Sequence, residues 1–129
     1  MNNNKKIKEF TDLRALQKAH ILVLAIYSST KKFPREEIFG LTSQMQRAAI
    51  SVTSNIAEGF GRQTYKEKIQ FYYLSQGSLT ELKNQLIAAK DIGYLTNSRF
   101  QELIDVADDA HRLLQGLIAK SKAFLNRKS

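Results

Sequence analysis

Apolar residues recur every three or four positions in four long stretches of the chain, which is the spacing of an amphipathic helix. The predicted helices span residues 12–30, 42–60, 64–92 and 98–125. Most of the connections between them are short, so successive helices are expected to run antiparallel. The pattern predicts an all-α fold, an antiparallel up-and-down four-helix bundle that takes up residues 1–129 as one domain. The short terminal stretches 1–9 and 126–129 are expected to be basic and mobile.

The ends of the predicted helices carry residues that commonly cap helices. Thr11 is the expected N-cap of the first helix, and Thr64 and Ser98 each open a Ser/Thr-x-x-Glu/Gln capping box. Gly93 follows the third helix, as glycine commonly does past a helix C-terminus. The connection 31–40 contains a proline and three large apolar residues, so it is expected to pack over the bundle end instead of continuing the first helix.

The first predicted helix contains seven successive apolar residues, Ile21–Tyr27, so its C-terminal half is apolar on every side. One bundle core buries a single stripe of a helix, and a helix that is apolar all round is expected to be buried on all sides. Part of this helix is therefore predicted to lie in a subunit interface, together with the second apolar row of the last helix. That row consists of Leu103, Ala110, Leu113, Leu117 and Phe124.

Composition narrows the class of protein. The chain has 129 residues, of which 43% are hydrophobic and 25% charged, as in an ordinary globular protein. One proline and six glycines are too few for the turns of an all-β chain. The lack of cysteine excludes a disulfide, a thiolate nucleophile and a Cys-based zinc site. No apolar stretch approaches the ~20 residues of a membrane span or resembles a signal peptide, so a cytoplasmic protein without membrane contact is expected.

The formal net charge of +8 lies at the two ends of the sequence. In an up-and-down bundle the start of the first helix, the end of the second, the start of the third and the end of the fourth share one end. Ten basic residues are expected there as candidate nucleic-acid contacts: Lys5, Lys6, Lys8, Arg62, Lys66, Lys68, Lys120, Lys122, Arg127 and Lys128. Such a patch suits an anionic partner such as RNA or DNA. The alternative is that these charges only keep the protein soluble.

A polar row follows one face of the second predicted helix, because its members are three or four residues apart. The row consists of Arg47, Ser51, Asn55, Glu58 and Arg62. As a functional site it would bind an anion, or contact nucleic acid through Asn55. As a structural network it would join helices or subunits, with Glu58 paired to Arg62 or Arg47. The small residues around the row suit tight packing and favour the structural interpretation.

Gly77 is assigned to the same structural network. A glycine inside a helix costs ~1 kcal/mol relative to alanine, so a close helix crossing is expected to offset this cost. Glu81 lies one turn further on and is expected to accept a hydrogen bond across that crossing. A catalytic role for Glu81 is disfavoured because no partner accompanies it at a fixed spacing.

Four carboxylates share one side of the last predicted helix: Glu102, Asp105, Asp108 and Asp109. A metal-dependent enzyme is the corresponding hypothesis, but no matching His or Glu motif lies on another helix. A solvated face is favoured, and the alternative is a face that pairs with a basic neighbour in an oligomer. His20 and His111 are expected to lie ~10 Å apart along the bundle axis, too far to share a metal. Neither a catalytic triad nor a nucleotide-binding motif is present, and no catalytic residue, cofactor or metal is predicted.

Four motifs, in this order, resemble one known protein family. They are Gln44–Ser51 (QMQRAAIS), Ser54–Arg62 (SNIAEGFGR), Gly77–Leu82 (GSLTEL) and Ala89–Leu95 (AKDIGYL). Over about residues 10–118 the chain resembles the bacterial 23S rRNA intervening-sequence proteins. The resemblance implies a left-handed four-helix bundle that assembles as a ring-shaped homopentamer. The family is also similar to the accessory protein of diversity-generating retroelements, a basic pentamer that works with a reverse transcriptase and nucleic acid.

No enzymatic activity is established for that family, so the resemblance determines the fold better than the function. The first hypothesis is a non-enzymatic homo-oligomer, expected to be a pentamer, whose basic end binds RNA or DNA or a nucleic-acid-processing enzyme. The alternative is a purely structural or protein-interaction scaffold without nucleic-acid binding. A metal enzyme built on the carboxylates of the last helix is the third hypothesis.

Overall fold

Four long helices make up most of the described chain. The protein is represented by a computed structural model that describes residues 6–127. Its helices are α1 (Arg14–Thr30), α2 (Leu41–Gly61), α3 (Tyr65–Ile92) and α4 (Asn97–Arg127). Two short 3-10 helices precede α1 and α2, namely η1 (Phe10–Asp12) and η2 (Arg35–Glu37). No strand occurs within residues 6–127, so the predicted all-α fold with four helices is confirmed.

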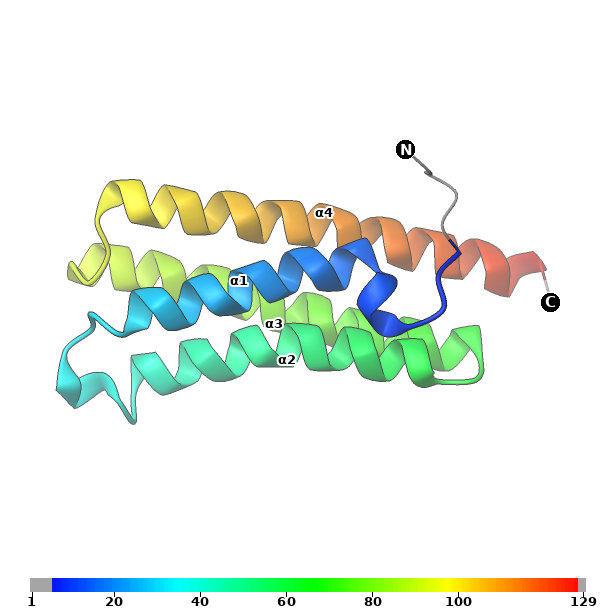
Figure 1. Ribbon diagram of the computed structural model, residues 1–129, viewed down its shortest axis with the longest axis horizontal. Coiled ribbons are helices and arrows are strands. Elements are labelled where there is room, and N and C mark those ends of the chain that lie inside the picture. Colours follow the sequence, from blue (N-terminus) through cyan, green and yellow to red (C-terminus); the bar gives the residue numbers. More distant parts are fainter. Residues whose placement is uncertain (1–5, 128–129) are drawn as a thin grey trace.

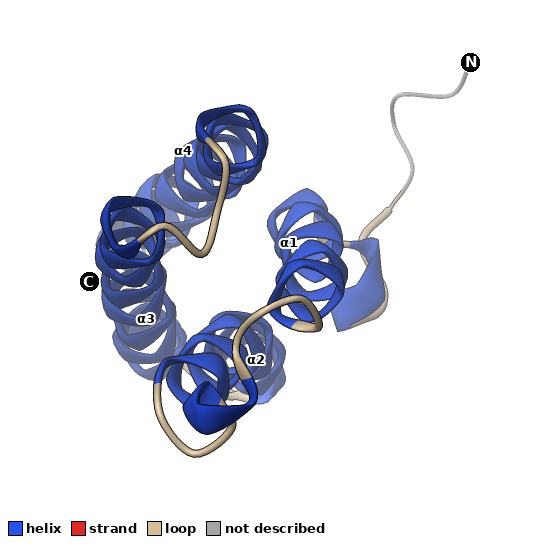
Figure 2. Cartoon of the chain, turned by 90° about the vertical axis from the view of Figure 1, so that its left-hand side faces the viewer, coloured by secondary structure: helices blue, strands red, loops and turns tan. Residues whose placement is uncertain are grey.

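The helices form a ring of antiparallel neighbours (Figures 1 and 2). α1 and α3 each pack against both α2 and α4, and neither diagonal pair is in contact within the described chain. Seen end on, the four helices surround a common centre, and each connection joins two neighbours of the ring. This is the up-and-down topology that the sequence predicts. No helix among residues 6–127 is both long enough and apolar enough to cross a membrane.

A continuous apolar core fills the centre of the ring. Its fully buried large side chains come from all four helices: Leu22, Ile26, Met45, Val52, Ile56, Tyr72, Leu79, Leu82, Leu86, Leu103 and Leu114. Full burial of a Val, Leu, Ile or Met side chain contributes roughly 1.5–3 kcal/mol of transfer free energy. The apolar stripe of each helix therefore determines which face it turns to the centre.

The second apolar row of α4 belongs to this core. Leu103 and Ala110 are almost fully buried, and Leu113 and Leu117 pack against the buried cluster. The prediction that this row lies in a subunit interface is therefore wrong for Leu103 and Ala110. The physical reason is that α4 contacts two neighbours, α1 and α3, so its inward apolar stripe is wide enough to include both rows.

The C-terminal half of α1 does leave apolar side chains outside the core. Ile21 and Leu24 keep 50% and 57% of their surface exposed, although Leu22, Val23 and Ile26 beside them are buried. Tyr27 extends the exposed stripe by one turn. The helix is thus apolar on its inner and outer faces, as its sequence indicates. Its place in a subunit interface stays a prediction.

Helix α3 begins and ends where its sequence signals indicate. The Glu67 backbone N–H donates to Thr64 Oγ1 at 3.2 Å, so Thr64 is the N-cap. The Thr64 hydroxyl donates to the Glu67 carboxylate at 2.8 Å. At the other end Gly93 takes φ 101°, the left-handed conformation that an L side chain rarely adopts.

The start of α1 differs from the prediction. Asp12 Oδ2 accepts the backbone N–H groups of Lys8 and Glu9 at 3.0 Å and 3.1 Å and closes η1. Thr11 lies inside η1 and is not the N-cap of α1, which begins two residues after it is expected to. The chain thus forms a separate 3-10 turn first, and Leu13, which has no side-chain cap, directly precedes α1. The Asp12 carboxylate also ties Lys8 and Glu9, part of the terminal stretch expected to be mobile, to the first turn.

The start and end of α4 also differ from the prediction. Thr96 is its cap instead of Ser98, because Thr96 Oγ1 accepts the Arg99 backbone N–H at 3.0 Å. The helix continues through Arg127, so residues 126–127 are helical and not part of a mobile tail.

The connection 31–40 covers the bundle end only in part. Phe33 is buried, and its ring lies 5.3 Å from the Tyr94 ring in the turn between α3 and α4. Ile38 is half-exposed, and Phe39 keeps 97% of its surface exposed. The expected packing of this connection is therefore correct for Phe33 and wrong for Phe39, which points into solvent at the tip.

Candidate nucleic-acid interface

The four segments expected to share the basic end do share it. The segment before α1, the end of α2, the start of α3 and the end of α4 lie together at the right of Figure 1. Eight of the ten candidate contacts fall within the described residues, and we call these eight the basic pole: Lys6, Lys8, Arg62, Lys66, Lys68, Lys120, Lys122 and Arg127. Lys5 and Lys128 lie outside the described residues.

Half of the basic pole is not paired. Lys6, Lys8, Lys66 and Lys120 are exposed, and the side chain of none of them forms an ion pair or hydrogen bond with another residue of 6–127. Their charges are therefore available to an anion from outside the chain. Lysines of this kind contact phosphate groups in nucleic-acid complexes.

Three other cations of the basic pole lie against aromatic rings. The pairs are Arg62 over Phe71 at 4.5 Å, Lys122 over Tyr73 at 5.0 Å and Arg127 over Phe124 at 5.4 Å. Phe124 in turn stacks on Tyr65, with ring centroids 5.2 Å apart. Such a contact is worth ~0.5–1 kcal/mol at an exposed site, because the ring quadrupole attracts the cation. These rings were not among the predicted site residues. Basic and aromatic residues alternate in 60–73, and this pattern could have indicated that rings lie beside the cations.

Lys68 has an intramolecular role. Its Nζ donates to the Phe60 carbonyl oxygen at 2.6 Å and lies 5.3 Å from the Phe60 ring. The Lys68 ammonium thereby satisfies a carbonyl group in the last turn of α2. A cation at this end of a helix also interacts favourably with the helix dipole. Partial burial lowers the pKa of Lys68 from its ordinary value. Lys68 thus closes the α2–α3 turn and is the least available of the eight cations.

In the polar row of α2, Ser51 bonds to another helix, and the other bonds of the row join its own members. Ser51 Oγ and Ser78 Oγ of α3 lie 2.8 Å apart, and the Asn55 amide donates to the Ser51 carbonyl oxygen at 2.9 Å. Glu58 pairs with Arg62 at 3.1 Å, which settles the two partners that the sequence left open. The neighbouring bond from Ser75 Oγ to the Val52 carbonyl oxygen, 2.7 Å long and buried, was not anticipated. The structural interpretation of Ser51, Asn55 and Glu58 is thus supported by their bonds.

Gly77 is not at a close helix crossing. It is exposed, and a Cβ placed on it would meet nothing within 4 Å, so that prediction is wrong. The close approach occurs at Gly59, where a Cβ would lie 2.8 Å from Tyr72 Cε1 and 2.9 Å from Phe71 Cβ. The register of α3 turns Ser75 and Leu79 inward, and Gly77 between them faces out.

Arg47 and Glu81 do not join the network. Their side chains make no hydrogen bond or ion pair within residues 6–127, so the bond expected of Glu81 is absent there. Both line a shallow cleft of about 480 Å³ beside the exposed Phe39. Arg47 is therefore not part of the hydrogen-bonded network that contains Ser51 and Asn55.

The carboxylates of α4 pair with basic residues of the same chain. Lys83 Nζ lies 2.9 Å from Asp108 Oδ1, and Asp109 pairs with Arg112 and, at 3.8 Å, with Lys18. No group of three metal-ligating side chains occurs in the described part of the chain. The favoured interpretation, a solvated face, agrees with the half-exposed carboxylates of these pairs, and pairing with a basic neighbour in an oligomer stays a prediction.

The two histidines have separate surroundings. His20 is exposed on α1, in a groove beside Phe10 and Ser54. His111 on α4 lies with its Nδ1 2.8 Å from Lys83 Nζ of α3. Burial and the nearby Lys83 ammonium lower the pKa of His111, and Asp108 opposes them. Nδ1 of a neutral His111 therefore accepts a hydrogen bond from the Lys83 ammonium, and this bond helps to join α3 to α4.

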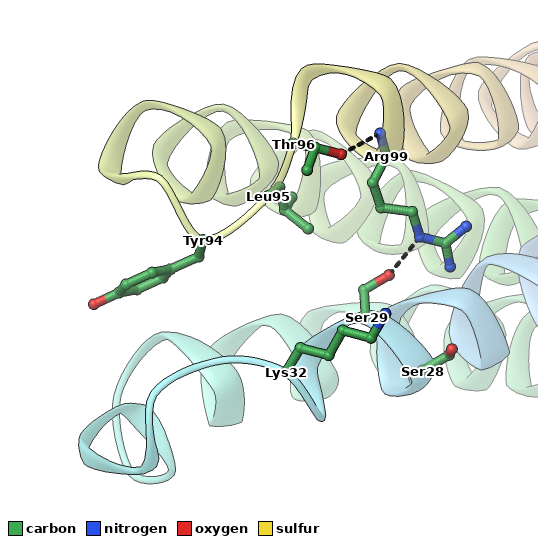
Figure 3. Close-up of a pocket in the computed structure, with 7 residues that line it drawn as sticks. All are labelled: Ser28, Ser29, Lys32, Tyr94, Leu95, Thr96 and Arg99. Carbon is green, nitrogen blue, oxygen red and sulfur yellow. Dashed lines mark hydrogen bonds between the residues drawn. The ribbon is translucent and has the colours of Figure 1, made fainter.

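A second cleft, of about 390 Å³, lies at the end opposite the basic pole (Figure 3). Arg99 crosses it from α4, and its Nε donates to Ser29 Oγ of α1 at 2.9 Å. Its guanidinium also donates to the Ala25 carbonyl oxygen at 3.4 Å and lies 3.6 Å from Glu102. This arginine is occupied by its own chain, so the cleft offers an anion only Lys32 as a cation without a partner among residues 6–127.

Comparisons with known proteins identify a family through one family model. The family model of the 23S rRNA-intervening sequence protein matches residues 11–116. Among solved structures, the chain is similar to a protein of unknown function from the S23 ribosomal protein family of Bacteroides thetaiotaomicron. The two share 17% sequence identity and a TM-score of 0.75 over 81% of this chain and 95% of that chain. At this identity the likeness shows the fold alone. A search of curated proteins found no match.

Proposed function

The chain belongs to the 23S rRNA-intervening sequence protein family, and from that premise we propose that it binds RNA or DNA through the basic pole. It acts as a non-enzymatic, oligomeric protein of the cytoplasm. The solved structure to which it is similar is itself described as a protein of unknown function, so the argument rests on the residues of this chain.

The observation that carries the proposal is the set of unpaired lysines at one end. Lys6 and Lys8 come from the segment before α1, Lys66 from α3 and Lys120 from α4, and none is neutralised within the described chain. Folding thus brings together charges that are far apart in sequence. Several cations on one surface attract a polyanion, because each phosphate contact releases counterions into solution.

The opposite end shows that this is not a general property of the surface. It carries five cations, Lys31, Lys32, Arg35, Lys90 and Arg99, beside four carboxylates, Glu36, Glu37, Asp91 and Glu102. The basic pole has eight cations beside Glu9, Asp12, Glu58 and Glu67. The electrostatic potential that attracts a polyanion is therefore strongest at the basic pole.

Two charge-matched variants test where the nucleic acid binds. One replaces Lys8, Lys66 and Lys120 with Glu at the basic pole. The other replaces Lys31, Lys32 and Arg35 with Glu at the opposite end, which lowers the net charge by the same amount. Binding is measured by fluorescence anisotropy with short labelled RNA and DNA strands over a series of salt concentrations.

We expect the basic-pole variant to lose roughly tenfold or more in affinity at low salt, and its log affinity to fall less steeply with log salt, by about 0.7–0.9 per phosphate contact removed. The opposite-end variant should stay close to the wild type. Equal loss in both variants would mean that net charge alone attracts the probe, which contradicts the assignment to the basic pole. No binding by the wild type even at low salt would favour the scaffold hypothesis instead.

The oligomeric part of the proposal rests on the exposed apolar stripe of α1. Ile21, Leu24 and Tyr27 form a surface that a second copy of the chain would cover, and the resemblance to the family sets the expected number of subunits at five. Leu24→Glu should dissociate the oligomer without loss of helical content, as measured by light scattering and circular dichroism. A wild-type chain that is monomeric at micromolar concentration would contradict this part of the proposal.

A further inference from the structure

We propose that the basic pole prefers single-stranded nucleic acid over duplex, because its exposed aromatic rings stack on unpaired bases. This inference rests on the proposed function, that the pole binds nucleic acid, and adds the class of ligand. Its structural basis is a set of rings that lie between the cations on the α3–α4 side of the pole.

Tyr73 is the most accessible of these rings. It keeps 42% of its surface exposed on α3, and Lys122 of α4 lies over the ring at 5.0 Å. Lys66 precedes it by seven residues, so both lie on the same face of α3 about 10 Å apart along the helix. One exposed ring therefore has one cation over it and an unpaired lysine about two turns away on the same helix face.

A second ring platform lies nearer the end of the bundle. Tyr65 at the start of α3 stacks on Phe124 near the end of α4, with an angle of 15° between the ring planes. Arg127 lies over Phe124 at 5.4 Å. Tyr65 and Tyr73 are eight residues apart, so the two platforms are separated by about 12 Å along α3. A strand that follows α3 would meet a ring, a cation and a second ring in turn.

This arrangement matches the chemistry of single-strand recognition. Proteins that bind single strands without sequence preference combine cations that follow the backbone with aromatic rings on which bases stack. In a duplex the base faces are already stacked on their neighbours, so a surface ring gains nothing from them. Every base has a π face, which makes this contact independent of sequence and available to RNA and DNA alike.

A simpler explanation is that the cations only cover apolar rings with their side-chain stems. The distribution of the contacts argues against it. Of the six cation–ring contacts in the described chain, five lie at the basic pole, and only Lys90 over Phe100 lies at the opposite end. The opposite end also exposes the Phe39 ring, yet no cation lies over this ring among the described residues.

The test compares single strands and duplexes that carry the same number of phosphates. Tyr73→Leu keeps an apolar side chain and removes the ring, and Phe39→Leu removes an exposed ring at the opposite end as the matched control. We expect Tyr73→Leu to weaken binding of single-stranded RNA and DNA roughly tenfold and to leave duplex binding unchanged. Phe39→Leu should change neither.

The absence of tryptophan from the chain allows a direct readout of stacking. Tyr73→Trp provides a single indole at the platform, and its emission should be quenched by a single strand but not by an equally charged duplex. Circular dichroism of each variant checks that the bundle is intact.

The failure of this inference is distinguishable from failure of the proposed function. If neither single strands nor duplexes bind the wild type, the proposed function is wrong. If both bind and Tyr73→Leu weakens them equally or not at all, the pole binds nucleic acid by charge alone and the single-strand preference is wrong. Equal quenching of the indole by single strands and duplexes would overturn it as well.

Discussion

The two ends of the bundle differ in what their charged side chains contact: at the end that holds the 31–40 connection two bonded groups join separate segments, whereas most cations of the basic pole lie over rings or in solvent. Arg99 bonds to Ser29 and to a carbonyl of α1, and Tyr94 donates to Glu37 at 2.8 Å. Lys66 and Lys120 have no such acceptors within the described residues. At the first end Arg99 and Glu37 thus join separate segments, and at the basic pole the unpaired lysines stay available to a partner.

The comparison shows that the net charge of an end does not by itself indicate whether its charges are available to a partner. A cation paired within its own chain contributes little to the potential outside, because its partner cancels most of the field. An exposed ion pair is in turn worth only ~0–1 kcal/mol of stability. What distinguishes the basic pole is therefore a group of lysines from three separate segments that have no acceptor within the described residues, namely Lys6, Lys8, Lys66 and Lys120. The pole must then be held together by packing, and the opposite end by polar bonds.

The largest expected effect tests the packing at the basic pole. Gly59→Ala places a Cβ 2.8 Å from the buried Tyr72 ring and 2.9 Å from Phe71 Cβ, so α2 and α3 must separate. We expect the free energy of unfolding to fall by ~1–3 kcal/mol, the usual cost of overpacking. Urea unfolding at a fixed protein concentration measures it.

Gly77→Ala is the matched control on the neighbouring helix. Nothing lies within 4 Å of its Cβ, so the same substitution should stabilise the protein by up to ~1 kcal/mol through helix propensity alone. Two variants with equal stabilities would show that the crossing at Gly59 relaxes freely, and the pole would then not depend on close packing.

A smaller effect is expected at the end opposite the basic pole, which holds the 31–40 connection and which we call the polar end. Arg99→Lys removes the bonds to Ser29 Oγ at 2.9 Å and to the Ala25 carbonyl oxygen at 3.4 Å, because an ammonium lacks the planar fork of the guanidinium. We expect a loss of ~1 kcal/mol and a clear coupling with Ser29→Ala in a double-mutant cycle. Arg62→Lys at the basic pole is the control, and should cost less because its pair with Glu58 is exposed. If Arg62→Lys proved as costly as Arg99→Lys, the distinction between the two ends would fail.

The sequence predicts the features of this fold that depend on local chemistry. Thr64 and Gly93 mark the ends of α3 correctly because each acts on backbone groups within a few residues. The four helices follow from the apolar periodicity for the same reason. Thr11 fails as the N-cap of α1 because the chain first forms η1, which contains Thr11 and which the Asp12 carboxylate closes. A separate turn of this kind before a helix cannot be recognised from the capping pattern alone.

Features that depend on the rotation of one helix against another are predicted less well. The sequence predicts a close crossing at Gly77, yet the crossing is at Gly59. Both glycines are compatible with either role until the register of α3 against α2 is known. The basic pole was predicted from topology, but which of its lysines are occupied was not. Lys68 shows why, because its acceptor is a carbonyl of another helix, eight residues away.

The smallest expected effect concerns the pH dependence of the polar end. Glu37 accepts the Leu41 backbone N–H at 3.1 Å and the Tyr94 hydroxyl at 2.8 Å, and these bonds lower the pKa of Glu37 from its ordinary value of 4.5. Because this pKa is lower in the folded state, its contribution to stability is complete above pH 4.5 and is lost as the pH falls further.

Tyr94→Phe removes the second of these donors and should move the pKa of Glu37 part of the way back up, as followed by a carbon NMR titration of the carboxylate. The variant should also lose less stability in acid than the wild type, because less of the Glu37 contribution remains to be lost. An unchanged pKa would mean that the Leu41 amide alone holds the carboxylate. The polar end would then be closed by the start of α2 itself, and the bond between the 31–40 connection and the α3–α4 turn would contribute nothing to it.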